Sequence, residues 1–235
     1  HSHTTASDGK MTIEESAEIA KARGFHTLAV TDHSQSSAVA GGLKPDRLRE
    51  HMKAVRAADK AIKGIKLLAG SEVDILVDGS LDYDDELLAT FDYVVASVHT
   101  HFNLPQEEMT ARIVKAVLHP RVTMLGHATG RLLLRRDAYK VDLEAVLRAA
   151  AKSGTMIEIN ANPWRLDLDW RWIRYAMEQG VMLAINPDAH EMEGYADMQY
   201  GVWMGRKGGL TKEMTLNALS GKEIAAYFES RNAKI

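Results

Sequence analysis

Short apolar runs rich in β-branched residues alternate along this chain with longer amphipathic stretches. Runs of this length are typical of buried strands, and the amphipathic stretches have the apolar spacing of helices. The runs predict strands over residues 26–31, 66–70, 93–98, 122–126, 155–160 and 181–185. The amphipathic stretches predict helices over residues 12–23, 45–62, 105–118, 141–152, 168–179, 195–205, 211–219 and 221–230, and residues 73–83 predict a hairpin.

Strands that alternate with helices favour a parallel sheet covered by helices. We therefore expect an α/β fold, a distorted (β/α)7 TIM-like barrel with parallel strands, and an open doubly wound sheet is the alternative. No repeat or linker interrupts the pattern, which predicts a single domain over residues 1–235. The chain opens on His1 without a preceding strand, so we expect a fragment whose first strand lies upstream.

Histidine and carboxylate side chains follow most of the predicted strands. In a barrel the carboxyl ends of the strands surround one mouth, where such side chains can meet. His1 and His3 are two positions apart, as are Asp188 and His190, so each pair faces one side of an extended chain. The candidate metal ligands are His1, His3, Asp8, His33, Glu72, His99, His127, Asp188 and His190.

These nine donors predict a site for more than one metal ion, since a single ion takes about four to six ligands. The chain has no cysteine, which excludes thiolate ligands and disulfides. Imidazole and carboxylate ligands suit Zn²⁺, Mn²⁺ or Fe²⁺ better than Ca²⁺ or a lone Mg²⁺. Paired ions activate water and stabilise an in-line phosphoryl displacement, so the pattern predicts a metal-dependent phosphoesterase.

The composition restricts the partners of such an enzyme. A net charge of −3 means that any contact with nucleic acid must come from a local basic patch. Arg131, Arg135 and Arg136 follow His127, and Arg165 follows another strand end, so we expect them to hold substrate phosphate; a solvated helix end is the alternative for the first three. No apolar run approaches the ~18 residues of a membrane span, and the absence of cysteine fits the cytoplasm.

The strand-end motifs resemble those of the PHP (polymerase and histidinol phosphatase) superfamily. The motifs are His1-x-His3, Ser7-Asp8-Gly9, Thr31-Asp32-His33-Ser34, Gly70-Ser71-Glu72, Ser97-Val98-His99, Gly126-His127 and Asp188-Ala189-His190. Three longer strings, over residues 78–83, 126–136 and 158–163, are similar to the C-terminal PHP domain of bacterial and archaeal family X DNA polymerases. The resemblance extends from His1 to about Phe228. Proline at Pro187 and alanine at Ala128 depart from the usual pattern, but neither removes a ligand.

The resemblance implies three divalent ions, usually Mn²⁺ or Zn²⁺, at the carboxyl ends of the strands. It assigns one ion to His1, His3 and Asp188. A second is assigned to His99 and His127, with Glu72 bridging these two ions. The third is assigned to Asp8, His33 and His190. Glu72, Asp188 and His190 are the residues expected in catalysis by in-line attack of a metal-bound hydroxide.

The resemblance also implies 3′→5′ exonuclease, 3′-phosphatase and abasic-site cleavage activities on the 3′ ends of DNA, single-stranded or gapped. Polymerase domains would then lie upstream in the full-length chain. A small-molecule phosphatase such as histidinol phosphatase is the alternative, because the metal ligands would contact only the phosphate. A non-catalytic structural PHP domain is less favoured, because every ligand position is filled.

Overall fold

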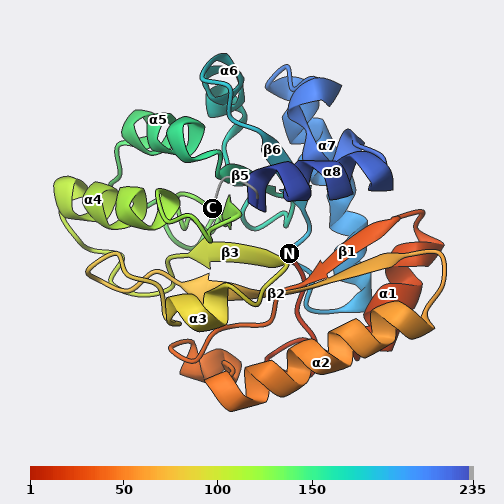
Figure 1. The fold of residues 1–235 in the computed structure, drawn as a ribbon. Helices are drawn as coiled ribbons and strands as arrows, with labels where there is room; N and C mark the ends of the chain where they lie inside the picture. Colours follow the sequence, from red (N-terminus) through yellow and green to blue (C-terminus); the bar gives the residue numbers. More distant parts are fainter. Residues whose placement is uncertain (233–235) are drawn as a thin grey trace.

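The computed structural model describes residues 1–232, and its centre is a six-stranded parallel sheet (Figure 1). The strands are β1 (Thr27–Val30), β2 (Lys66–Asp74), β3 (Tyr93–Ser97), β4 (Met124–Leu125), β5 (Met156–Asn160) and β6 (Leu183–Asn186). Their order in the sheet is their order in the chain. Crossovers that all proceed in one direction curl the sheet and leave the helices outside, whereas a doubly wound sheet reverses its order. The barrel-like α/β fold is therefore confirmed.

The helices surround the curled sheet (Figure 1). They are α1 (Ile13–Ala22), α2 (Pro45–Ala61), α3 (Asp85–Leu88), α4 (Gln106–Val117), α5 (Leu143–Ser153), α6 (Trp170–Glu178), α7 (Met198–Lys207) and α8 (Gly221–Asn232). Short 3-10 turns are η1 (Ala38–Ala40), η2 (Met192–Asp197), η3 (Lys212–Met214) and η4 (Leu216–Ala218). Local signals explain several boundaries: Thr12 and Glu15 form a capping box on α1, and Pro45 occupies the first turn of α2. None of these helices is long and apolar enough to cross a membrane.

Two predicted elements are wrong. Residues 211–219 form the two turns η3 and η4 instead of a helix. The backbone N–H of Ile185 donates to Asn217 Oδ1 at 2.7 Å, and Asn217 Nδ2 donates to the carbonyl of Ile185 at 2.8 Å. The Asn217 amide thus replaces a neighbouring strand along the edge of β6. The predicted hairpin at 73–83 is reduced to a single antiparallel bridge between Ile75 and Leu81, because β2 extends to Asp74.

The N-terminal residues lie between the carboxyl ends of β1 and β6. Ser2 forms a parallel bridge with Ala189, and its carbonyl accepts the backbone N–H of Thr31 at 2.9 Å. The N–H of His3 donates to the carbonyl of Ala189 at 2.9 Å. These bonds place His1 and His3 at the mouth of the curled sheet. The strand that we expected before His1 stays a prediction.

The opposite end of the curled sheet is filled with apolar side chains. Tyr93, Met124 and Met156, each the first residue of its strand, are buried there and cluster with Leu216 and Ile224 from η4 and α8. A larger apolar cluster packs between the outer face of the sheet and the surrounding helices. The apolar cluster therefore occupies the end where the strands begin.

Candidate metal centre

The structure brings all nine predicted ligands together at the carboxyl ends of the strands. The N-terminal segment contributes three of them, the residues that follow β1, β3 and β4 contribute one each, β2 itself contributes Glu72, and the loop after β6 contributes two. Gly126 precedes His127 because a Cβ at this position would lie 2.4 Å from Ser97 Oγ. The parallel topology thus produces the convergence that the sequence pattern predicts.

Three groups of ligand atoms each lie within 4.8 Å of one another, close enough to hold an ion. The groups are His1–His3–Asp188, His33–Glu72–His99 and His3–Asp8–His33–His190. The first group is one expected from the resemblance, and the last contains the expected Asp8, His33 and His190 together with His3. In the remaining group His33 stands where His127 was expected. The second and third groups show that His3 and His33 stand between neighbouring positions, which suits closely spaced ions.

Glu72 lies at the centre of the cluster. Its Oε1 is 3.3 Å from His1 Nε2, 3.2 Å from His99 Nε2 and 2.9 Å from His127 Nε2. Its Oε2 is 2.9 Å from His33 Nδ1. Burial opposes ionisation of this carboxyl, but the nearby histidine charges, above all His99 and His1, hold its pKa well below the usual range. A permanently ionised carboxylate among four imidazoles has the position of a bridging ligand.

The unpaired nitrogens of the cluster fit divalent cations. His1 Nε2 and His33 Nδ1 are buried and have no hydrogen-bond partner among the described residues, although Glu72 oxygens lie 3.3 and 2.9 Å away. A buried polar atom without a partner is costly, and here the orientation is wrong for a direct hydrogen bond. An ion between nitrogen and carboxylate would satisfy both atoms, so the donor set fits Zn²⁺ or Mn²⁺.

Further residues orient the ligands from behind. His1 Nδ1 donates to Glu158 Oε1 at 2.7 Å, and His99 Nδ1 donates to Asp74 Oδ1 at 2.6 Å, which leaves the Nε2 atom of each ring facing the centre. Glu158 also accepts the backbone N–H of His127 at 2.7 Å. Neither Glu158 nor Asp74 is among the residues that the sequence singled out as candidate ligands. The signal for Asp74 was available, because it lies two residues after Glu72 on one strand.

Asp32 organises the loop that carries Asp8. It accepts hydrogen bonds from the Thr4 backbone at 2.8 Å and from Ser7 Oγ at 2.6 Å, and its Oδ2 is 2.8 Å from His51 Nε2. Burial raises the pKa of Asp32, but the hydrogen bond and charge of His51 outweigh it and keep the pKa below the usual range. Asp32 thus holds this loop in place, and the sequence analysis did not predict its contact with His51.

The four candidate phosphate-binding arginines differ sharply in their surroundings. Arg165 Nε lies 3.5 Å from Asp188 Oδ2, and its Nη1 is buried without a partner among the described residues. Arg131 is occupied by the carbonyls of Arg165 and Leu166 and by Asp169. Arg136 donates twice to the carbonyl of Gly130.

Among these four arginines, Arg165 is the one that lines the cavity of about 430 Å³ over the ligand cluster. Arg135 is exposed instead, with its guanidinium 4.3 Å from the ring centre of Trp164. The loop carrying Arg131, Arg135 and Arg136 is irregular, so it is not the helix end of the alternative interpretation. His101 lies outside the ligand groups and lines a separate pocket with Phe102 and Arg136.

Comparisons with known proteins agree with this site. Residues 1–162 match the PHP domain. The chain is 42% identical, over 97% of its length, to the Bacillus subtilis DNA polymerase/3′-5′ exonuclease PolX, and it spans 40% of that protein. It is 30% identical over 81% of its length to a probable phosphatase of Acetivibrio thermocellus, covering 78% of that protein. It is 28% identical over its whole length to a probable phosphatase of Thermoanaerobacter sp. (strain X514), covering 95% of it.

A solved structure has a similar fold. The crystal structure of histidinol phosphate phosphatase from Lactococcus lactis, complexed with zinc, L-histidinol and phosphate, matches with a TM-score of 0.61. The match covers 90% of this chain and 93% of that one, at 18% sequence identity. At this identity the likeness supports the barrel-like architecture.

Proposed function

We propose that this chain, which belongs to the PHP domain family and is a metal-dependent phosphoesterase, hydrolyses phosphoesters at the 3′ ends of DNA. The observation that carries the proposal is the convergence of nine imidazole and carboxylate ligands around Glu72. The 42% identity to a DNA polymerase/3′-5′ exonuclease favours DNA over small phosphate esters. The expected reactions are 3′→5′ exonuclease, 3′-phosphatase and abasic-site cleavage.

Three divalent ions, Mn²⁺ or Zn²⁺, would be held by the ligand set implied by the family resemblance. His1, His3 and Asp188 would hold one, His99 and His127 a second with Glu72 bridging the two, and Asp8, His33 and His190 the third. The three compact groups of donor atoms and the unpaired imidazole nitrogens support this number. When bound, such ions lower the pKa of water and neutralise charge on phosphate oxygens.

The protein's own residues would orient the substrate for in-line displacement. Arg165 lines the cavity over the candidate ligands, where its forked guanidinium would bind a non-bridging phosphate oxygen well. Glu72, Asp188 and His190 are the catalytic ligands of the proposal. His190 is the most exposed of them, with 37% of its side chain accessible, so it faces the side from which substrate arrives.

We also propose a place for this domain within a longer protein. Residues 1–235 would act as a single domain beside polymerase domains of a longer cytoplasmic protein. The span of 40% of the Bacillus subtilis relative and the absence of cysteine support this arrangement.

The second candidate is a small-molecule phosphatase acting on a substrate such as histidinol phosphate. The probable phosphatases among the relatives favour it, because this chain covers 95% and 78% of the length of two of them. The metal ligands alone do not discriminate the two substrates, since they would contact only the phosphate.

Turnover of several substrates by the Mn²⁺- or Zn²⁺-loaded protein tests the proposal. Single-stranded DNA, DNA with a 3′-phosphate and histidinol phosphate should be compared at equal concentration. We expect kcat/KM to be highest for the DNA substrates. Faster turnover of histidinol phosphate would favour the second candidate, and hydrolysis of no phosphoester at all would favour a structural PHP domain.

A further inference from the structure

Two large apolar side chains are exposed beside the candidate metal centre. Leu134 is 98% exposed and Trp164 is 46% exposed. Single exposed apolar residues are common on protein surfaces and need no explanation by themselves. These two belong to loops that are joined, because the backbone N–H of Leu133 donates to the carbonyl of Trp164 at 2.6 Å.

Leu134 is unfavourable for the fold in two respects. It occupies the tip of a tight turn, in which the N–H of Arg135 donates to the carbonyl of Leu132 at 2.9 Å. Its φ of +63° lies in the left-handed region, where asparagine or glycine is preferred and a leucine is strained. Leu134 therefore gains little from burial, and with Trp164 it forms an exposed apolar pair, which favours a role at the surface.

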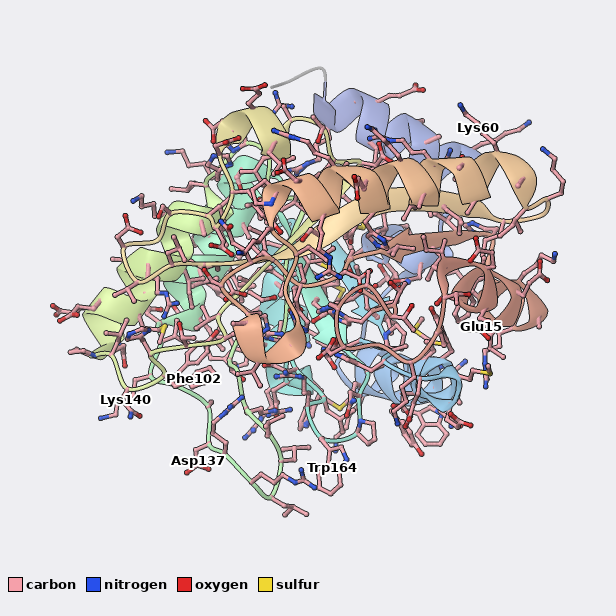
Figure 2. All side chains as sticks on the ribbon, turned by 90° about the horizontal axis from the view of Figure 1, so that it is seen from below. Glu15, Lys60, Phe102, Asp137, Lys140 and Trp164 are labelled. Atoms are coloured by element: carbon pink, nitrogen blue, oxygen red, sulfur yellow. The ribbon has the colours of Figure 1, made fainter. Side chains whose placement is uncertain are left out.

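Trp164 is held in place from two sides. Its backbone N–H donates to Asn162 Oδ1 at 2.9 Å, and the guanidinium of Arg135 lies over its ring. Figure 2 shows Trp164 and Asp137 on loops at one end of the molecule, far from Lys60 on α2. The next residue, Arg165, lies against Asp188.

Charge and aromatic surface alternate in this strip. The guanidinium of Arg135, the ring of Trp164 and the guanidinium of Arg165 follow one another toward the ligand cluster. A nucleic-acid strand alternates phosphates and bases in the same manner, and aromatic rings bind bases of any sequence by stacking. A small phosphate ester inside the cavity next to Arg165 would leave Trp164 and Leu134 without a contact.

We propose that Trp164, supported by Arg135 and Leu134, is a stacking platform for the base next to the phosphate that is cleaved at a single-stranded DNA 3′ end. The inference rests on the proposed function and specifies its substrate. Arg135 would neutralise the following phosphate. The platform would raise affinity for DNA and leave the chemistry at the metal ions unchanged.

Steady-state kinetics on two substrates test the platform. One is an oligodeoxythymidylate, and the other is glycerophosphoglycerol, a diester with neither a base nor any other aromatic ring. Trp164→Ala is the main variant, Trp164→Phe should retain part of the stacking, and Leu134→Asn removes the apolar tip while suiting the left-handed turn. Trp203→Ala is the matched control, because Trp203 is a 57% exposed tryptophan on α7.

We expect Trp164→Ala to reduce kcat/KM on the oligonucleotide by roughly 5- to 100-fold, mainly through KM, because one stacked base contributes on this scale. Leu134→Asn should give a smaller loss. Turnover of the diester should stay within about twofold for every variant, since no base is present to stack. The wild-type protein should show the same loss of affinity for an oligonucleotide in which abasic residues replace the terminal bases.

The outcomes separate this inference from the proposed function. If the wild-type protein cleaves the diester but not the oligonucleotide, the proposed DNA substrate is wrong. If it cleaves both and Trp164→Ala behaves like Trp203→Ala on the oligonucleotide, the platform is wrong and the DNA substrate stands. An equal loss on both substrates would assign Trp164 a structural role and also overturn the platform.

Discussion

The two ends of the curled sheet are built from the same strands but contain opposite chemistry. At the amino end, Met124 and Met156 are sealed by Ile224 from α8. At the carboxyl end, Glu72 and its imidazoles leave donor atoms unpaired. The amino end lowers the free energy of the fold through apolar burial, while the carboxyl end concentrates charges that burial disfavours. Stability and chemistry are therefore separated along one strand direction, as in other barrels.

Glu72→Gln is the change at the carboxyl end that we expect to lower activity most. Removing the central charge should lower kcat for phosphoester hydrolysis by more than about 100-fold, because even residues behind the ligands contribute 10- to 100-fold at metal sites. Elemental analysis should show loss of bound metal, and circular dichroism should show a retained fold. His101→Ala is the control, with an expected change under about twofold, and the reverse ranking would overturn the assignment of Glu72.

Met156→Ala tests the amino end. Met156 is fully buried, so the truncation should lower the free energy of unfolding by about 2–5 kcal/mol, measured by urea denaturation. Metal content and kcat of the folded fraction should remain at the wild-type level, since the site lies at the other end of the strands. A large fall in kcat with unchanged stability would contradict the separation of the two ends.

Protons and metal ions compete for the histidines at the carboxyl end, so the affinity for metal should depend on pH. Burial lowers the pKa of His99, but the carboxylates of Glu72 and Asp74 outweigh burial and raise the pKa to about 10 in the metal-free protein. A raised pKa means that His99 carries a proton at neutral pH, which must leave before an ion can bind. Metal affinity should therefore rise with pH, by about tenfold per unit for each proton released, until the pH passes this value.

Titration of the metal-free protein with Mn²⁺ between pH 6 and 9 would measure this effect, with proton release followed in a weakly buffered solution. The Met156→Ala variant should show the same dependence of metal affinity on pH as the wild-type protein. An affinity that is constant over the whole range would show that the histidines do not bind the ion.

Of the changes at the carboxyl end, Arg165→Met is expected to have the smallest effect on activity. It removes the guanidinium that lies against Asp188 and keeps a side chain of similar length. We expect kcat/KM to fall by roughly 10-fold or more, the scale of one charged hydrogen bond, with the metal content unchanged. Arg131→Met is not expected to affect KM directly, because Asp169 and two carbonyls occupy its guanidinium. If Arg165→Met and Arg131→Met changed KM equally and the free energy of unfolding equally, the two arginines would not differ in role.

The order of strands and helices, and the convergence of the nine candidate ligand residues at one end of the sheet, could be predicted from the sequence. Apolar runs and caps are local signals, and a histidine or carboxylate directly after a strand is carried to the mouth by the parallel topology alone. The grouping into three compact sets was expected from the family resemblance, and the structure places His3 and His33 between neighbouring sets.

Tertiary structure decided which side chains support the candidate ligands and which line the cavity. Arg131 and Arg165 look alike in the sequence, but carbonyls more than thirty residues away occupy only the first. Residues 211–219 were predicted to form a helix, but they cover the edge of β6 instead. The reason is again distant in the sequence, because Asn217 forms two hydrogen bonds with the backbone of Ile185 on that strand. Such outcomes depend on hydrogen bonds between segments remote in the chain, which no local periodicity records, whereas strand order and ligand position follow from neighbours along the sequence.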